Sequence, residues 1–256
     1  MAADAEPYHL GCSPATVCWG YMDPAVPPRL SVPDGARVLV DCVNGGPEVI
    51  PTEPPREGLG QPEWLIPSEL AEIHEQITER VNPGHILTGP VFVEGAEPGD
   101  VLRIDIEAVD LRTNWAWTAS RPYGGAFADT EPAHLRHTLL APPTSAAEPG
   151  AGWAFPAWGG RLDLQPFFGV IGVAPPPEIG RQSSIPPRNG HGGNLDCKEL
   201  VAGTTLFLPV NVPGALLFVG DGHARQGDGA NFSKAVNYFS HAVVDRSKHP
   251  FCQDML

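Results

Sequence analysis

Two glycine-rich stretches of this chain concentrate side chains that could hold a metal ion or transfer a proton. The first reads NGHGGNLD and contains His191 and Asp196; the second reads GDGHARQGDG and contains Asp221, His223 and Asp228. Imidazole nitrogens and carboxylate oxygens are ligands of zinc and related divalent cations, and a hydrolytic zinc site uses about three of them plus an open position for water. Glycine permits the backbone turns through which neighbouring side chains converge on one ion. We therefore expect a metal site formed by His191, Asp196, Asp221 and His223.

The same residues also have a simpler interpretation. Asn-Gly and Asp-Gly pairs are typical of hairpin turns, in which the Asn or Asp side chain bonds to its own backbone. In that case His191 and His223 would be ordinary surface groups. The two stretches match neither the helical HExxH motif nor a CxxC motif, so the expectation depends on the density of candidate ligands. Each histidine has a glycine neighbour and is followed within five residues by aspartate, which favours the site.

His85 and Glu94 are further candidates, because they lie on either side of an apolar run that is typical of a strand. Glu94 could act as a general base, or could orient a metal-bound histidine. The alternative is that Glu94 is an exposed strand terminus in an acidic turn with Glu97 and Asp100. Both interpretations are open at this point.

A covalent mechanism is a further alternative, because Cys197 directly follows Asp196 and activated thiols serve as nucleophiles in some enzymes. In an extended segment, however, neighbouring side chains point in opposite directions, and a free cysteine more often fills a small apolar space. The serine pair Ser183 and Ser184 stands outside any GxSxG motif. The chain also lacks the GxGxxG and P-loop patterns, which disfavours a nucleotide cofactor.

The elements that must position these residues are mainly strands. Short apolar or alternating runs bounded by Gly, Pro, Asp or Asn recur along the chain, and the clearest is VLRIDIEAVDL at residues 101–111. Only residues 67–81 predict a helix, with Ser68 as its N-cap. The chain from Asn231 onward changes in composition, and we interpret it as a terminal helix through Val244 or a frayed end. The predicted fold class is mainly β.

The overall composition limits the classes of partner. The chain has 256 residues and a formal net charge of −14, so its surface repels phosphate, which disfavours nucleic acids and anionic membranes. No apolar run approaches the ~20 residues that span a bilayer, and the N-terminus lacks a signal-peptide pattern. Five scattered cysteines without CxxC pairs favour reduced thiols. We expect a soluble, cytoplasmic protein that binds a small molecule or a metal.

Four motifs, in this order, resemble the acetamidase/formamidase family: LTGPVFVEGAEPGDVL (87–102), FFGVIGVAP (167–175), NGHGGNLDCKEL (189–200) and GDGHARQGDG (220–229). With YHL and DPAVPPRLSVPDGARV near the start, the resemblance extends over residues 8–230. It implies a jelly-roll-like β-sandwich with a smaller β-barrel or α/β part. We place a catalytic region at residues 1–230, with a sub-boundary near residue 145, and an atypical tail at 231–256.

The resemblance implies hydrolysis of small linear amides, such as formamide or acetamide, to a carboxylate and ammonia by a metal-activated water. It further implies a divalent metal ion, with zinc as the first candidate, and a homodimer or higher homo-oligomer. We expect Glu94 or Asp228 to pass the water proton to the leaving nitrogen. Asn194 or Gln226 would donate a hydrogen bond to the tetrahedral oxyanion.

One position departs from the family pattern. The last motif commonly continues as QGDGE, whereas Ala230 stands here in place of that glutamate. The family also continues with further strands where this chain changes to NFSKAVNYFSHAV and ends at Leu256. The rival hypothesis is therefore a catalytically impaired or non-catalytic binding protein on the same fold.

The motifs leave the size of the substrate open. Four tryptophans could line a small apolar pocket: Trp115, Trp117, Trp153 and Trp158. Large apolar rings are also typical anchors of cores and loops, and we favour that interpretation for all four.

Overall fold

The computed structural model describes residues 6–53, 63–120, 133–141, 152–156, 159–187 and 190–227, together with the backbone of residues 238–247. These residues form four β-sheets, the α-helix α1 (Ser68–Gln76) and the short 3-10 helix η1 (Pro47–Val49). The prediction of a mainly β fold is confirmed. The sub-boundary predicted near residue 145 lies outside the described residues.

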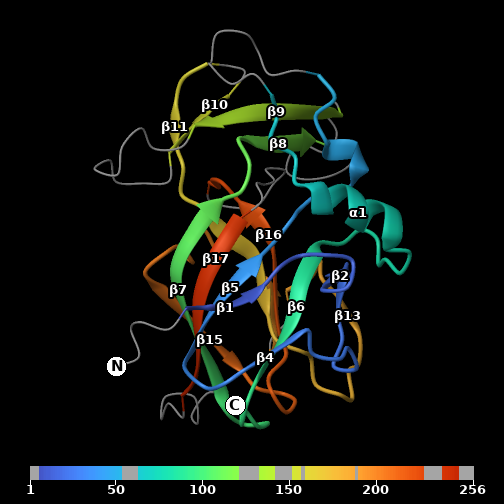
Figure 1. The fold of residues 1–256 in the computed structure, drawn as a ribbon, viewed down its shortest axis with the longest axis vertical. Coiled ribbons are helices and arrows are strands. Elements are labelled where there is room, and N and C mark those ends of the chain that lie inside the picture. The colour runs from blue at the N-terminus through green and yellow to red at the C-terminus, as the bar shows by residue number, and fades with distance from the viewer. Residues whose placement is uncertain are drawn as a thin grey trace.

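Two large sheets form the body of the molecule (Figure 1). The five-stranded sheet has the order β1 (Tyr8–Leu10), β5 (Ala36–Asp41), β17 (Tyr238–Ser247), β7 (Val101–Leu111), β15 (Thr204–Pro209). The six-stranded sheet has the order β14 (Gly192–Asn194), β12 (Phe167–Gly172), β16 (Leu217–His223), β6 (Ile86–Val93), β2 (Val17–Trp19), and β4 (Leu30–Val32) also pairs with β6.

The two large sheets share the main hydrophobic core, so they pack as a sandwich. The core joins Ile104 on β7 to Phe168 on β12 and Val219 on β16. The alternation predicted for residues 101–111 is confirmed in its first half, where Leu102, Ile104 and Ile106 are buried. A strand with one buried and one polar face requires this alternation, because successive side chains point to opposite sides of the sheet.

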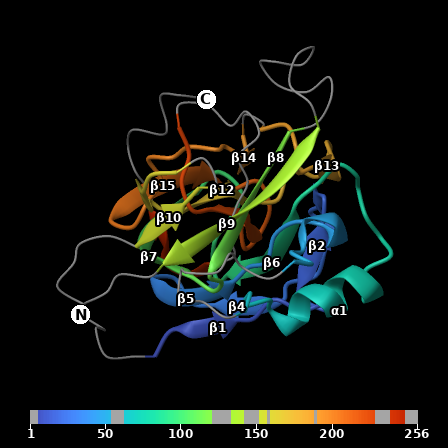
Figure 2. The ribbon, with the colours of Figure 1, turned by 90° about the horizontal axis from the view of Figure 1, so that it is seen from above.

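A smaller sheet stands at one end of this body, above α1 in Figure 1 and over the ends of the larger strands in Figure 2. Its order is β11 (Leu162–Asp163), β10 (Trp153–Phe155), β9 (His134–Ala141), β8 (Trp115–Ser120). A two-stranded sheet pairs β13 (Gln182–Ser183) with β3 (Tyr21–Met22). The small sheet matters for function because it forms one wall of the pocket described below.

Two local predictions were wrong. The helix α1 ends at Gln76 instead of residue 81, because the following backbone turns to β2, where Val81 N–H donates to the Trp19 carbonyl at 3.0 Å. Its N-cap is Pro67 instead of Ser68, and the cap carries no side-chain hydrogen bond.

The tail contains a strand, β17, and not a helix through Val244. This strand lies between β5 and β7 and pairs with both, so it supplies the backbone partners that two buried strands need.

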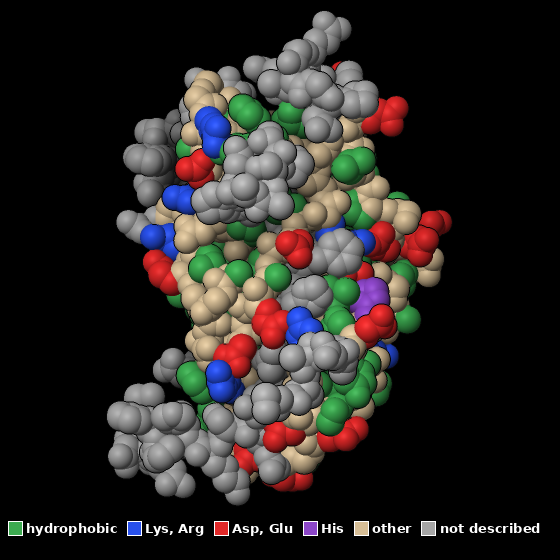
Figure 3. All heavy atoms as spheres, turned by 60° about the vertical axis from the view of Figure 1, so that its left-hand side comes forward, with side chains coloured by type: hydrophobic (Ala, Val, Ile, Leu, Met, Phe, Trp, Pro, Cys, Tyr) green, Lys and Arg blue, Asp and Glu red, His purple; other side chains and the backbone are tan. Residues whose placement is uncertain are grey.

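The described surface mixes charges of both signs. On the face shown in Figure 3, acidic side chains lie among apolar and basic ones and do not gather in a single patch. Among the described residues, no helix is long and apolar enough to cross a bilayer.

Candidate active site

The two glycine-rich stretches meet at one end of the six-stranded sheet. Asp221 and His223 are among the last three residues of β16, and Asp196 lies in the loop that follows β14. The ligand atoms of these three side chains all lie within 4.8 Å of one another. His223 Nε2 is 3.1 Å from Asp221 Oδ2 and 3.6 Å from Asp196 Oδ1. Side chains from two distant stretches thus form one cluster, as the sequence predicted.

The floor of this cluster is Gly169, in the middle of the apolar strand β12. A Cβ atom built on Gly169 would lie 2.7 Å from Asp196 Oδ1, 2.7 Å from Asp221 Oδ2 and 2.9 Å from His223 Nε2. All three donor atoms therefore face one point above the glycine. Two carboxylates and one imidazole suit a divalent cation such as zinc, with a position left for water. The residues present fit a metal ion.

Both carboxylates reach the cluster from an unusual backbone conformation. Asp196 has φ 47° and Asp221 has φ 52°, in the left-handed region that costs a residue other than glycine about 1–3 kcal/mol. The N–H of Asp196 donates to the carbonyl of Gly169 at 3.1 Å, which holds the loop against β12. Conformations of this kind persist only where the surrounding structure enforces them, and they concentrate at functional sites.

Gln226 connects the two stretches and fixes the orientation of His223. Its Nε2 donates to the carbonyl of Asp196 at 2.7 Å, and its Oε1 lies 2.8 Å from His223 Nδ1. With this amide orientation Nδ1 carries the proton and donates to Gln226, which leaves the lone pair of Nε2 directed at the two carboxylates. A partner of this kind on the far nitrogen is typical of metal-binding histidines. The ring of His223 also packs against Phe167, with centroids 4.9 Å apart.

The electrostatics of the cluster also favour a cation. Burial lowers the pKa of His223, but the charge and the hydrogen bond of the Asp221 carboxylate, together with Asp196, outweigh burial and raise the pKa above its usual value. Two carboxylates close together in a buried place repel each other and stabilise any positive charge between them. A protonated His223 or a divalent cation can supply that charge.

Two residues outside the glycine-rich stretches complete the cluster. Asn44 is buried, and its Nδ2 donates to Asp221 Oδ1 at 2.9 Å. His85 is also buried, and its Nε2 lies 3.4 Å from Asp221 Oδ2. On the other side of the His85 ring, Nδ1 is 3.1 Å from Ser184 Oγ. Both carboxylate oxygens of Asp221 therefore have a polar contact, Oδ1 with Asn44 and Oδ2 with His85.

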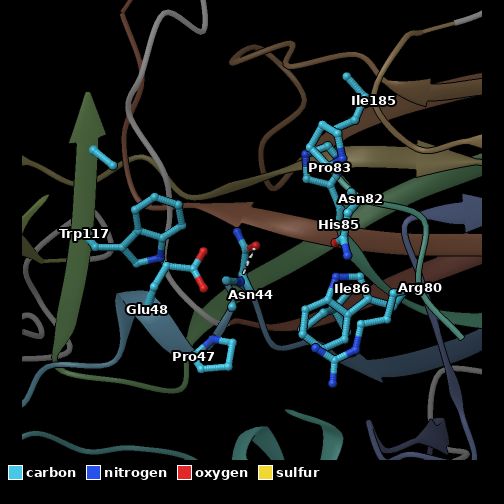
Figure 4. A pocket seen from close by; sticks show the side chains of 15 residues that line it. Asn44, Pro47, Glu48, Arg80, Asn82, Pro83, His85, Ile86, Trp117 and Ile185 are labelled. Atoms are coloured by element: carbon cyan, nitrogen blue, oxygen red, sulfur yellow. Dashed lines mark hydrogen bonds between the residues drawn. The ribbon is translucent and has the colours of Figure 1, made fainter. Parts of the chain in front are cut away.

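Asn44 and His85 also line a pocket of about 770 Å³. Figure 4 shows Asn44 on one side of this pocket with Glu48 and Trp117, and His85 on the opposite side with Ile86 and Arg80. Because both residues contact Asp221, they form the boundary between the pocket and the carboxylate cluster. The pocket therefore lies next to the cluster, with Asn44 and His85 between them.

The structure does not bring Glu94 to this site. His85 precedes β6 and Glu94 follows it, so about 30 Å of extended chain separates the two. Glu94 is exposed in a turn, and its N–H donates to the carbonyl of Val32 at 2.9 Å. The alternative interpretation, an exposed strand terminus beside Glu97, is the one that the structure supports. Asp228, the other predicted base, lies outside the described residues, as does Ala230.

Three further residues named from the sequence, His191, Asn194 and Cys197, are not among the three converging ligands. His191 is buried at 1% exposure next to β14, but it is not in the described group of converging ligands. Asn194 Nδ2 donates to the carbonyl of Ile185 at 2.8 Å. Cys197 is partly exposed, and its thiol lies 3.5 Å from Glu199 Oε2. The buried apolar role that the sequence favoured for Cys197 is wrong.

Sequence reasoning missed Gly169, Asn44 and Trp117. The run FFGVIG carried a signal for Gly169, because a glycine inside an apolar strand often marks the close approach of another group. Asn44 stands in the sequence VNGG, which reads as an ordinary turn. Trp117 is buried in a cluster with Val49 and Trp115, so the core interpretation is confirmed, and it also lines the pocket. The roles of Asn44 and Trp117 at the site have no local sequence signal, because each depends on contacts with distant segments of the chain.

Comparisons with known proteins agree with the fold and the motifs. The family model described as "Acetamidase/Formamidase family" matches residues 71–184 and 180–245, which together exceed half of the chain. The acetamidase of Mycolicibacterium smegmatis is 30% identical over 207 aligned positions, which cover 60% of this chain and 51% of that protein. The chain spans about half the length of the relatives that it matches in sequence.

Solved structures extend the likeness to nearly the whole chain. The crystal structure of an acetamidase from Bacillus halodurans has a TM-score of 0.72 at 29% identity, covering 94% of this chain and 71% of that chain. The crystal structure of an acetamidase from Yersinia enterocolitica has a TM-score of 0.73 at 27% identity, covering 97% of this chain and 71% of that chain. The likeness therefore includes both large sheets.

Proposed function

The chain belongs to the acetamidase/formamidase family, and from this membership we propose that it hydrolyses small linear amides to a carboxylate and ammonia with the help of a divalent metal ion. The observation that carries the proposal is the convergence of Asp196, Asp221 and His223 on one point above Gly169. When bound there, a divalent cation supplies Lewis acidity, which activates water and polarises the amide carbonyl.

The chain's own residues hold and orient the reacting groups. Asp196 and Asp221 supply negative charge to the site, and Asn44 and His85 fix Asp221 from the pocket side. Gln226 holds His223 in the tautomer that leaves Nε2 free of a proton. This arrangement is formed in advance, so little reorganisation is needed when substrate enters.

Proton transfer and oxyanion binding complete the proposal. Asp228, two residues after Gln226 in the sequence, is the group that we propose passes the water proton to the leaving nitrogen, which must be protonated to depart as ammonia. Asn194 and Gln226 each use one amide N–H on a backbone carbonyl. A primary amide has a second N–H, and this second donor is the one we propose for the oxyanion.

Zinc, a homodimeric or larger assembly and a cytoplasmic location are further parts of the proposal. Zinc follows from the mixed set of carboxylate and imidazole ligands. Elemental analysis of the purified protein tests the metal, and light scattering in solution tests the assembly. Fractionation of cells that express the chain tests the location.

The central test is ammonia release from formamide and acetamide before and after chelation. We expect turnover to disappear with the metal and to return when zinc is added back. The variant His223→Ala should lose both the metal and the turnover, and Thr118→Ala on β8, which contacts neither the cluster nor the pocket, serves as the matched control. Full turnover by metal-free protein would contradict the proposal.

The second candidate is a non-catalytic binding protein on the same fold. Two observations favour it: Ala230 stands where the family commonly has glutamate, and Glu94 lies too far from the cluster to replace that carboxylate. In that case the protein would bind one metal ion per chain and release no ammonia from either amide. The same two measurements therefore distinguish the candidates.

A further inference from the structure

The pocket next to the cluster is much larger than the amides from which the family takes its name. Its volume is about 770 Å³, which lies in the range of about 300–1,000 Å³ typical of sites for drug-sized ligands. Acetamide has four heavy atoms and occupies roughly 100 Å³, or about three times the share of one liquid water. An occupant that fills this pocket must therefore carry a sizeable substituent on the amide.

The walls of the pocket define the character of that substituent. Trp117 on β8 stands on one side, and Ile86 and Arg80 stand on the other side. Trp19 lies beside Ile86 as its partner on β2, with Arg80 over its ring. Figure 4 shows open space between the labelled side chains of the two sides. An aromatic ring on one wall and a planar guanidinium on the other favour a flat apolar ring. Aromatic pairs stack or meet edge to face at ring distances of about 4.5–7 Å, and guanidinium groups stack on aromatic faces.

The charges on the walls favour a neutral ligand. Arg80 covers the ring of Trp19 at 4.1 Å, and it donates to the carbonyls of Ile77 and His74, so its charge is held in place. Glu48 lies on the opposite side beside Trp117. One basic and one acidic side chain on facing walls balance each other, and a strongly charged ligand would meet a like charge on one side.

We propose that this pocket binds a primary amide whose acyl group carries a flat, uncharged ring, with the ring between Trp117 and the Arg80 guanidinium that covers Trp19, and the amide at Asn44 and His85. The inference rests on the proposed amide hydrolysis and names its substrate class. The reaction is the same: the carbon–nitrogen bond breaks, the water oxygen joins the acyl carbon, and one water hydrogen leaves on ammonia. The other hydrogen leaves the carboxylic acid as a proton, which gives a carboxylate and ammonium. Phenylacetamide is the simplest probe with these features.

The first measurement compares phenylacetamide with acetamide on the metal-loaded protein. We expect kcat/KM for phenylacetamide to be at least about tenfold higher, since added apolar contacts in a pocket are worth about 10–200-fold. The second measurement is calorimetric binding of phenylacetamide to protein with and without metal. Binding should persist without metal, because the ring contacts do not involve the cluster.

Variants on β8 test whether the ring occupies this pocket. Ala119 lines the pocket, and Ala119→Phe adds a ring to its wall without removing any core side chain. This variant should weaken phenylacetamide binding about tenfold or more, and it should lower kcat/KM for phenylacetamide more than for acetamide. Its matched control is Thr118→Phe, which adds the same ring to the opposite face of β8 and should change neither value.

The outcomes separate this inference from the proposed function. Turnover of acetamide without binding or turnover of phenylacetamide would overturn the inference and leave the proposed function intact. Binding of phenylacetamide that Ala119→Phe weakens, without turnover of any amide, would support the pocket assignment and overturn the proposed function. Equal effects of Ala119→Phe and Thr118→Phe on binding would also overturn the inference.

Discussion

The two ends of β6 differ in a way that explains where this molecule can do chemistry. At one end, His85 is buried and contacts Asp221, and the pocket opens beside it. At the other end, Glu94 stands exposed in a turn, where Asp100 accepts the N–H of Glu97 at 3.1 Å. Both ends carry titratable side chains next to glycine and proline, so local sequence does not distinguish them.

The difference lies in what the neighbouring strands bring to each end. Beside His85, β16 and β12 run antiparallel with Phe167 opposite His223, and Gly169 leaves room for three donor atoms above the sheet. At the Glu94 end, the backbone contacts come from Val32 and Gly214, and they only close a turn. A site needs converging side chains and space between them, and only the His85 end has both.

The largest expected effect comes from filling that space. The variant Gly169→Ala places a methyl group within 2.9 Å of all three donor atoms, so we expect metal binding to be lost and turnover to fall by about a thousandfold or more. The matched control is Gly227→Ala in the second glycine-rich stretch, where an added Cβ meets nothing within 4 Å among the described residues. Zinc content and ammonia release measure both variants. A Gly169→Ala protein with normal zinc content would show that the ion does not bind there.

Removing one carboxylate charge should have the next largest effect. Asp221→Asn keeps the size of the side chain but removes the negative charge between His223 and His85. We expect metal affinity to fall by more than about 100-fold, since even partners of metal ligands are worth about 10–100-fold. Chelator competition measures the affinity. Retention of wild-type affinity would remove Asp221 from the ligand set.

Loss of the connection made by Gln226 should have a smaller effect. Gln226→Ala removes the acceptor that holds His223 Nδ1 and the donor that holds the Asp196 loop, and we expect metal affinity to fall about 10–100-fold. Gln226→Glu keeps an acceptor for His223 Nδ1, loses the loop contact and adds a negative charge, so its metal affinity should be higher than that of Gln226→Ala. If the two variants bind metal equally, the acceptor on Nδ1 has no role in binding.

The sequence predicted that His191, Asp196, Asp221 and His223 converge, because ligand-type residues are concentrated around glycines in two stretches. The structure brings the last three together. The sequence also predicted the alternating strand β7, since a two-residue period is a local property. It could not predict that β17 lies between β5 and β7, because strand order depends on contacts between distant segments. For the same reason Glu94 was assigned to the site and Asn44 was not.

The smallest expected effect is at the Glu94 end of β6, opposite the His85 end. Glu94→Gln removes a charge that faces solvent, and exposed substitutions of this kind change the free energy of unfolding by about 0.5 kcal/mol or less. Because Glu94 also lies far from the cluster, turnover should stay within about twofold of wild type. The measurement is kcat against pH for acetamide. If Glu94 were the general base, kcat would fall by about 100-fold or more. Such a fall would require the Glu94 of one chain to reach the cluster of another, since within one chain the strand β6 keeps them apart.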